Sequence, residues 1–61
     1  MPAIFIIKGY RFFFFSSDGS EPKHVHIEKN GRYSKFWIYP IALAYNYKFT
    51  SMELRKIMNI I

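Results

Sequence analysis

The chain has 61 residues, which is enough for one domain over residues 1–61 and too short for a second one. It contains no cysteine, which excludes a disulfide framework, a thiolate zinc site and a thiol nucleophile. Nine Lys and Arg against four Asp and Glu give a net charge of +5, which either serves solubility alone or favours an anionic partner such as RNA.

Aromatic side chains make up 21% of the chain, a large apolar load for so few residues. Because a domain of this size cannot bury all of them, we expect an exposed subunit interface or stacking surface, and therefore a homo-oligomer. The apolar start is neither a signal peptide nor a membrane helix, because Pro2 directly follows the initiator and Lys8 and Arg11 interrupt the run. We expect a cytoplasmic protein without a membrane partner.

The first part of the chain predicts a β-hairpin. Residues 3–7 and 10–15 are β-branched and aromatic runs, and Lys8 and Gly9 between them suit a two-residue turn. This turn would place Phe5 opposite Phe12 and Ile6 opposite Arg11. The following residues, 16–23, contain Gly, Pro, Asp and three Ser, and are typical of a loop.

A second hairpin is predicted over residues 24–38. Residues 24–29 and 32–38 alternate in polarity around Asn30 and Gly31, the strongest short hairpin signal. Beyond them Pro40 suits the first turn of a helix, so residues 40–46 are expected to form one or two helical turns that Asn46 ends.

The last residues, 50–61, predict a helix. Thr50 and Glu53 have the spacing of a capping box. One helical stripe contains Leu54, Ile57, Met58 and Ile61. Together these elements predict an α+β fold, in which a mostly antiparallel sheet of about four strands, made of two hairpins, carries a C-terminal helix packed on one face.

The only two histidines of the chain lie on the second hairpin, two residues apart. Because side chains alternate along a strand, Val25 and Ile27 must face the core, and His24 and His26 the opposite side. The turn sets the register of the two strands, and directly opposed residues lie on the same face, so the cross-strand partners of these residues join the histidines. One surface is thus predicted to contain His24, His26, Glu28, Tyr33, Lys35 and Trp37.

This surface has the groups needed for acid/base cleavage of an RNA phosphodiester. His24 and His26 would take and give a proton, and Lys35 would stabilise the oxyanion. The candidate binding residues are Arg11, Glu28, Tyr33 and Trp37. Arg11 would contact phosphate, and Trp37 would stack on a base. The alternative is an ordinary polar sheet face, since solvent-facing residues of an antiparallel sheet are usually polar.

Metal binding is a minority alternative. His24 and His26 on one strand are close enough to share an ion, with Glu28 as a third ligand. No fourth ligand is visible nearby in the sequence, so we expect neither a resident metal nor another cofactor.

The chain resembles the small bacterial family of domain of unknown function 4160. The resemblance rests on "MPAIFIIKGYRFFFFSSDG", "EPKHVHIE", "KFWIYPIALAYN" and "ELRKI", and it covers essentially the whole chain. It implies a bacterial protein often encoded beside another small protein, in arrangements similar to toxin and antitoxin pairs. The family has no established activity to transfer, but the histidine pair that matches His24 and His26 is its hallmark.

The chain departs from the family pattern at Tyr39, where an acidic residue is usual, and at Lys48, where glycine is common. Family members also continue for about a dozen residues beyond the helix, so the chain is either naturally short or truncated. Two functions remain open. The chain acts on RNA as a toxin-like protein, or it is a non-enzymatic module that binds a cognate partner protein from a neighbouring gene through the same face or an edge strand.

Overall fold

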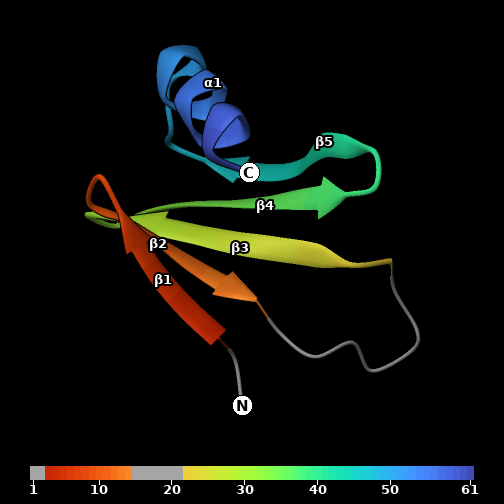
Figure 1. Cartoon of the computed structure of the whole chain (residues 1–61). Helices are drawn as coiled ribbons and strands as arrows, with labels where there is room; N and C mark the ends of the chain where they lie inside the picture. The colour runs from red at the N-terminus through yellow and green to blue at the C-terminus, as the bar shows by residue number, and fades with distance from the viewer. Residues whose placement is uncertain (1–2, 15–21) are drawn as a thin grey trace.

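The computed structural model describes residues 3–14 and 22–61, which form one five-stranded antiparallel sheet followed by a helix (Figure 1). The strands follow one another in the sheet in chain order, so β1 and β5 are its two edges. The elements are β1 Ala3–Ile7, β2 Tyr10–Phe14, β3 His24–Lys29, β4 Arg32–Ile38, β5 Ile41–Tyr47 and α1 Ser51–Ile60. The predicted α+β class is confirmed, with five strands in place of four.

Both predicted hairpins are confirmed, including their registers. Lys8 and Gly9 have φ values of 53° and 84°, and Asn30 and Gly31 have 50° and 79°. Two consecutive positive φ values define the type I′ turn, whose twist matches that of the flanking strands. The predicted loop over residues 16–23 and the end of the second predicted strand at Phe15 lie largely outside the described residues.

The prediction of a short helix over residues 40–46 is wrong, because this segment forms strand β5. Tyr39 and Pro40 form a turn that returns the chain along β4. Pairing with β4 satisfies the backbone groups that the two strands direct at each other, and this outweighs the helix propensity of the two alanines in the segment. The additional strand gives the sheet its fifth member.

A bulge in β5 changes which face its side chains occupy. Phe36 pairs with Leu43, whereas the preceding Lys35 pairs with Tyr45, so Ala44 is an extra residue between them. Leu43 therefore lies on the face of Phe36, and Tyr45 lies on the opposite face.

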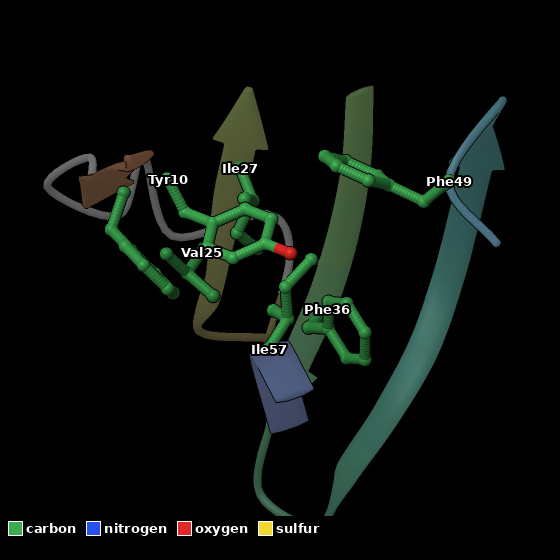
Figure 2. Close-up of a cluster of buried hydrophobic side chains, with 7 residues drawn as sticks. Tyr10, Val25, Ile27, Phe36, Phe49 and Ile57 are labelled. Atoms are coloured by element: carbon green, nitrogen blue, oxygen red, sulfur yellow. The ribbon is translucent and has the colours of Figure 1, made fainter. Parts of the chain in front are cut away.

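The core lies between one face of the sheet and α1. Its side chains converge from β2, β3 and β4, from Phe49 before the helix and from the helix itself (Figure 2). Its buried members are Tyr10, Phe12, Val25, Ile27, Phe36, Phe49 and Ile57. Because Val25, Ile27 and Phe36 are fully buried here, the neighbouring residues of β3 and β4 must face away from α1.

The capping box of α1 is confirmed. The Thr50 hydroxyl accepts a hydrogen bond from the Glu53 amide at 3.2 Å, and the Glu53 carboxylate accepts one from the Thr50 amide. The predicted apolar stripe needs one correction: Met58 is 39% exposed, and Ile60 packs against the core instead. In the described part of the chain no helix has the length and apolarity to cross a membrane.

Polar contacts among the described residues hold the start of α1 over the sheet. The Asn46 side chain exchanges hydrogen bonds with the backbone of Phe49, at 3.0 and 3.2 Å, and so holds Phe49 toward the core. Arg32 on β4 donates to the Glu53 carboxylate at 2.9 Å. Both contacts fix the start of the helix over the sheet.

We expect Ser34→Ala to raise the free energy of unfolding by about 1 kcal/mol. The Ser34 hydroxyl is fully buried on the core side and has no hydrogen-bond partner among the described residues. Its desolvation in the folded state is therefore not compensated. Urea unfolding of both proteins measures the difference, with exposed Ser51→Ala as control. A destabilised Ser34→Ala protein would contradict the expectation.

We expect stability to fall in acid through Glu53. Its hydrogen bond with the Thr50 backbone and the charge of Arg32 lower the pKa of Glu53 below its ordinary value of 4.5. The folded state thus holds the Glu53 proton less tightly than the unfolded state, so this stabilisation is present above pH 4.5 and is lost as the pH falls through the folded pKa. Glu53→Gln should flatten this acid limb in unfolding curves, whereas Arg55→Gln should leave it unchanged.

Candidate functional site

The six residues predicted to share a surface do lie on one face of the sheet, opposite α1. Cross-strand pairing places His24 with Trp37, His26 with Lys35 and Glu28 with Tyr33, as the turn register predicted. All six are partly buried, between the fully buried core residues and open surface. We call the side of the sheet that carries them the outer face.

Neighbouring strands extend the outer face on both sides. Directly opposed residues of antiparallel strands lie on the same face, so the pairing of β2 and β5 can be followed across the sheet. From β2 to β5, one set of directly opposed residues is Phe13, His26, Lys35 and Tyr45. The neighbouring set on the same face is Arg11, Glu28, Tyr33 and Tyr47. Arg11, predicted as a binding residue, is thus brought to the same face as the histidines.

Three outer-face residues were missed from the sequence. Tyr45 was assigned to the predicted helix over residues 40–46, Tyr47 lay outside every predicted element, and Phe13 lies on β2, whose pairing with β3 follows a long connection. The alternation of large side chains along residues 41–47 was the available signal for a strand. For Phe13 the available signal was its position two residues after Arg11, which places both side chains on the same face of a strand.

The His24 ring has a defined tautomer. Its Nδ1 lies 3.0 Å from the Pro22 carbonyl oxygen. Because a carbonyl oxygen can only accept, Nδ1 must carry the proton and donate it. In neutral His24 the lone pair is therefore on Nε2, the nitrogen that can take a proton from a substrate.

The His26 ring has a different hydrogen-bond partner. Its Nδ1 is hydrogen-bonded to the Tyr33 hydroxyl. Burial raises the pKa of Tyr33 above its ordinary value, although nearby Lys35 opposes this, so the phenol keeps its proton at neutral pH. Because a phenol hydroxyl can donate or accept, neutral His26 either accepts from Tyr33 at Nδ1 or donates to it from Nδ1. When His26 is protonated, the hydroxyl accepts from Nδ1 and Nε2 presents an N–H.

The two imidazoles are neighbours. Their centroids are 5.0 Å apart with the rings nearly perpendicular, and His24 has a similar edge contact with Trp37 at 5.9 Å. Neutral His24 thus has its lone pair at Nε2, and protonated His26 has an N–H at Nε2. This is the division of roles that a base and an acid require.

Cations on this face lie against aromatic rings. The Lys35 ammonium is 4.7 Å from the centroid of Trp37, the Arg11 guanidinium 5.2 Å from that of Phe13, and the Lys48 ammonium 5.2 Å from that of Tyr47. These distances are typical of cation–π contacts. Positive charge and flat apolar surface therefore alternate across the sheet.

A shallow hollow of about 390 Å³ lies beside His26. Its lining is Arg11, Phe13, His26, Glu28 and Tyr33. Arg11 is 3.4 Å from Glu28 in an exposed ion pair, which contributes little stability and is easily exchanged for another anion. The hollow is open on one side, so it suits part of an extended ligand.

The described residues contain no group of three His, Cys, Asp or Glu side chains arranged to hold a metal ion. His24 Nδ1 is already engaged with the Pro22 carbonyl and His26 Nδ1 with Tyr33. Metal binding through either Nδ1 atom would break one of these contacts.

A family model for a domain of unknown function, DUF4160, matches residues 9–61. The chain belongs to the DUF4160 family. The match includes both histidines and every outer-face residue named above. No curated protein and no solved structure matches the chain. The DUF4160 assignment fixes no activity, so the chemistry of the outer face is the basis for a function.

Proposed function

We propose that this DUF4160 protein binds single-stranded RNA across the outer face. The observation that carries the proposal is the alternation of cations and aromatic rings, with Arg11, Lys35 and Lys48 each beside a ring. Aromatic side chains stack on unpaired bases, and cations between them neutralise the backbone phosphates. The net charge of +5 adds a long-range attraction to the same ligand.

The shape of the face favours a single strand over a duplex. Trp37, Tyr45 and Phe13 lie on three different strands of one sheet, so a ligand that reaches them must expose successive bases. Stacked bases of a duplex are not available to such rings. Among the described residues of the face Glu28 is the one with a carboxylate, and its partner Arg11 offsets that charge.

Trp37→Ala should weaken binding of a short fluorescent single-stranded RNA about 5- to 150-fold, the effect of losing one stacking platform. Tyr39→Ala is the matched control, because Tyr39 is 83% exposed in the turn after β4 and should not affect binding. Fluorescence anisotropy at two salt concentrations measures both the affinity and its electrostatic part.

Equal affinity of wild type and Trp37→Ala would contradict this surface assignment. Absence of RNA binding by the wild type, together with binding of a partner protein that Trp37→Ala abolishes, would instead make the outer face a protein interface. Loss of binding in Tyr39→Ala would place the RNA elsewhere.

A second function, cleavage of the bound RNA, is supported by the contact between the two imidazoles and by the His24 tautomer, which leaves the Nε2 lone pair of the neutral ring as the base. His24 Nε2 takes the proton of a ribose 2′-hydroxyl, and the 2′-oxygen attacks the adjacent phosphorus. The bond from phosphorus to the 5′-oxygen breaks, and that oxygen takes the Nε2 proton of protonated His26. Lys35 stabilises the charge on the phosphoryl oxygens. The products are a 2′,3′-cyclic phosphate and a 5′-hydroxyl.

Incubation with RNA and with DNA of the same sequence, in the presence of a metal chelator, tests the reaction. RNA should be cleaved and DNA left intact, because DNA has no 2′-hydroxyl. Intact RNA, with or without added zinc, would contradict cleavage while leaving RNA binding unaffected.

We place this activity in a toxin of a toxin and antitoxin pair, whose cognate partner covers the outer face. An exposed basic and aromatic face is the surface that such a partner must block. Induced expression in bacteria should arrest growth with the wild type and not with His24→Ala. Normal growth with both would contradict the toxin role.

A further inference from the structure

The edge strand β1 exposes apolar side chains on both faces of the sheet. Phe5 and Ile7 pair with core-side residues of β2, and Ile4 and Ile6 lie on the outer side. The four side chains are between 39% and 69% exposed. A run of four exposed apolar residues on a sheet edge is unusual in a protein that stays monomeric.

The free edge of β1 offers two outward-facing backbone units. Lys8 and Gly9 form a type I′ turn, in which Ile7 exchanges hydrogen bonds with Tyr10. Inward and outward backbone groups alternate along an antiparallel strand. The N–H and C=O groups of Phe5 therefore also face β2, while those of Ile4 and Ile6 face away from the sheet.

The other edge, β5, is protected in a way that β1 is not. The bulge at Ala44 disrupts its register, and bulges are a usual device against edge pairing. A proline and a lysine flank both edge strands, so these residues do not distinguish β5 from β1. β1 pairs with β2 in a regular register, and the stretch from Ile4 to Ile7 has no charge and no proline.

We propose that β1 pairs antiparallel with β1 of a second copy of this chain, about a two-fold axis at Phe5. Ile4 of each copy then exchanges hydrogen bonds with Ile6 of the other copy, which satisfies all the outward groups of both residues. The arrangement is self-complementary, as a two-fold interface requires. Because each copy has a net charge of +5, a seam along the uncharged stretch from Ile4 to Ile7 brings fewer like charges together than a contact through the basic outer face.

This pairing also covers apolar surface beside the seam. An apolar cavity of about 230 Å³ lies between the core side of β1 and the end of α1. Its lining includes Phe5, Ile7, Ile60 and Ile61. In the dimer Phe5 of the second copy lies next to Phe5, at the open rim of this cavity.

The two-fold axis is perpendicular to the sheet, so both outer faces lie on the same side of one continuous sheet.

Sedimentation of the full chain over a range of concentrations tests the dimer. Ile6→Lys should raise the dimer dissociation constant at least about tenfold, because it places a charge in the apolar seam. Met52→Lys is the matched control: Met52 on α1 is 68% exposed and Ile6 69%, so both monomers tolerate the substitution equally. Wild type and Met52→Lys should dimerise alike.

Amide hydrogen exchange of the wild type gives a readout that does not depend on a variant folding. The Ile4 and Ile6 amides should be protected in concentrated samples and exchange freely on dilution, whereas the Phe5 and Ile7 amides stay protected in both. A monomeric wild type overturns the proposal, as does a dimer that leaves the Ile4 and Ile6 amides unprotected or survives Ile6→Lys unchanged.

Discussion

Ile57→Ala is expected to lower the free energy of unfolding by about 2–5 kcal/mol. Ile57 is fully buried and is the only buried residue of α1, so it is the main apolar anchor of the helix on the sheet (Figure 2). A domain of 61 residues has a total stability of roughly 3–9 kcal/mol. The loss therefore takes up much or all of the stability, and the variant should be largely unfolded near 37 °C.

Met58→Ala is the control for this effect. Met58 follows Ile57 in the same helix but is 39% exposed, so its loss should change stability by only about 1 kcal/mol. Urea unfolding followed by circular dichroism measures both variants. Equal destabilisation by the two substitutions would show that the helix is held by its whole apolar stripe and not by Ile57.

The two hairpins could be predicted because their information is local. Asn30 and Gly31 define a turn type, the turn defines the register, and the register assigns each side chain of β3 and β4 to a face. Burial of Val25 and Phe36 then confirmed the assignment of His24 and His26 to the outer face. The capping box of Thr50 and Glu53 was equally local and equally reliable.

β5 could not be predicted in the same way because its structure depends on β4. Pro40 and two alanines are compatible with a helix in isolation, and only the open edge of β4 makes a strand the better solution. The bulge at Ala44 could not be predicted from the sequence either. It requires knowledge of the pairing on both sides of it, and it decides that Tyr45 joins the histidines while Leu43 does not.

The different hydrogen-bond partners of His24 and His26 could not be predicted from the sequence, for a related reason. A register gives directly opposed partners, which are Trp37 for His24 and Lys35 for His26. The hydrogen-bond partners are different: Tyr33 lies diagonal to His26, and the Pro22 carbonyl belongs to the segment before β3. Diagonal contacts depend on twist and rotamer, which the spacing of residues does not determine.

If the outer face cleaves RNA, His24→Ala and His26→Ala should each reduce the cleavage rate about 100- to 10,000-fold. His24 would supply the base and His26 the acid, so either loss removes one of the two proton transfers. The wild-type rate should have a bell-shaped pH dependence, because His24 must be neutral and His26 protonated at the same time. Time courses with a labelled RNA over a pH series measure rates and profile together.

The variants should differ in the limb of the pH profile that they remove. Without the base His24 the rate should lose its acid limb, and without the acid His26 it should lose its alkaline limb. Tyr33→Phe removes the hydroxyl that orients His26, so it should lower the rate less than His26→Ala while both limbs remain. RNA affinity should stay close to wild type in all three, since the Trp37 ring and the Lys35 charge remain. Identical residual profiles for the two histidine variants would contradict distinct base and acid roles.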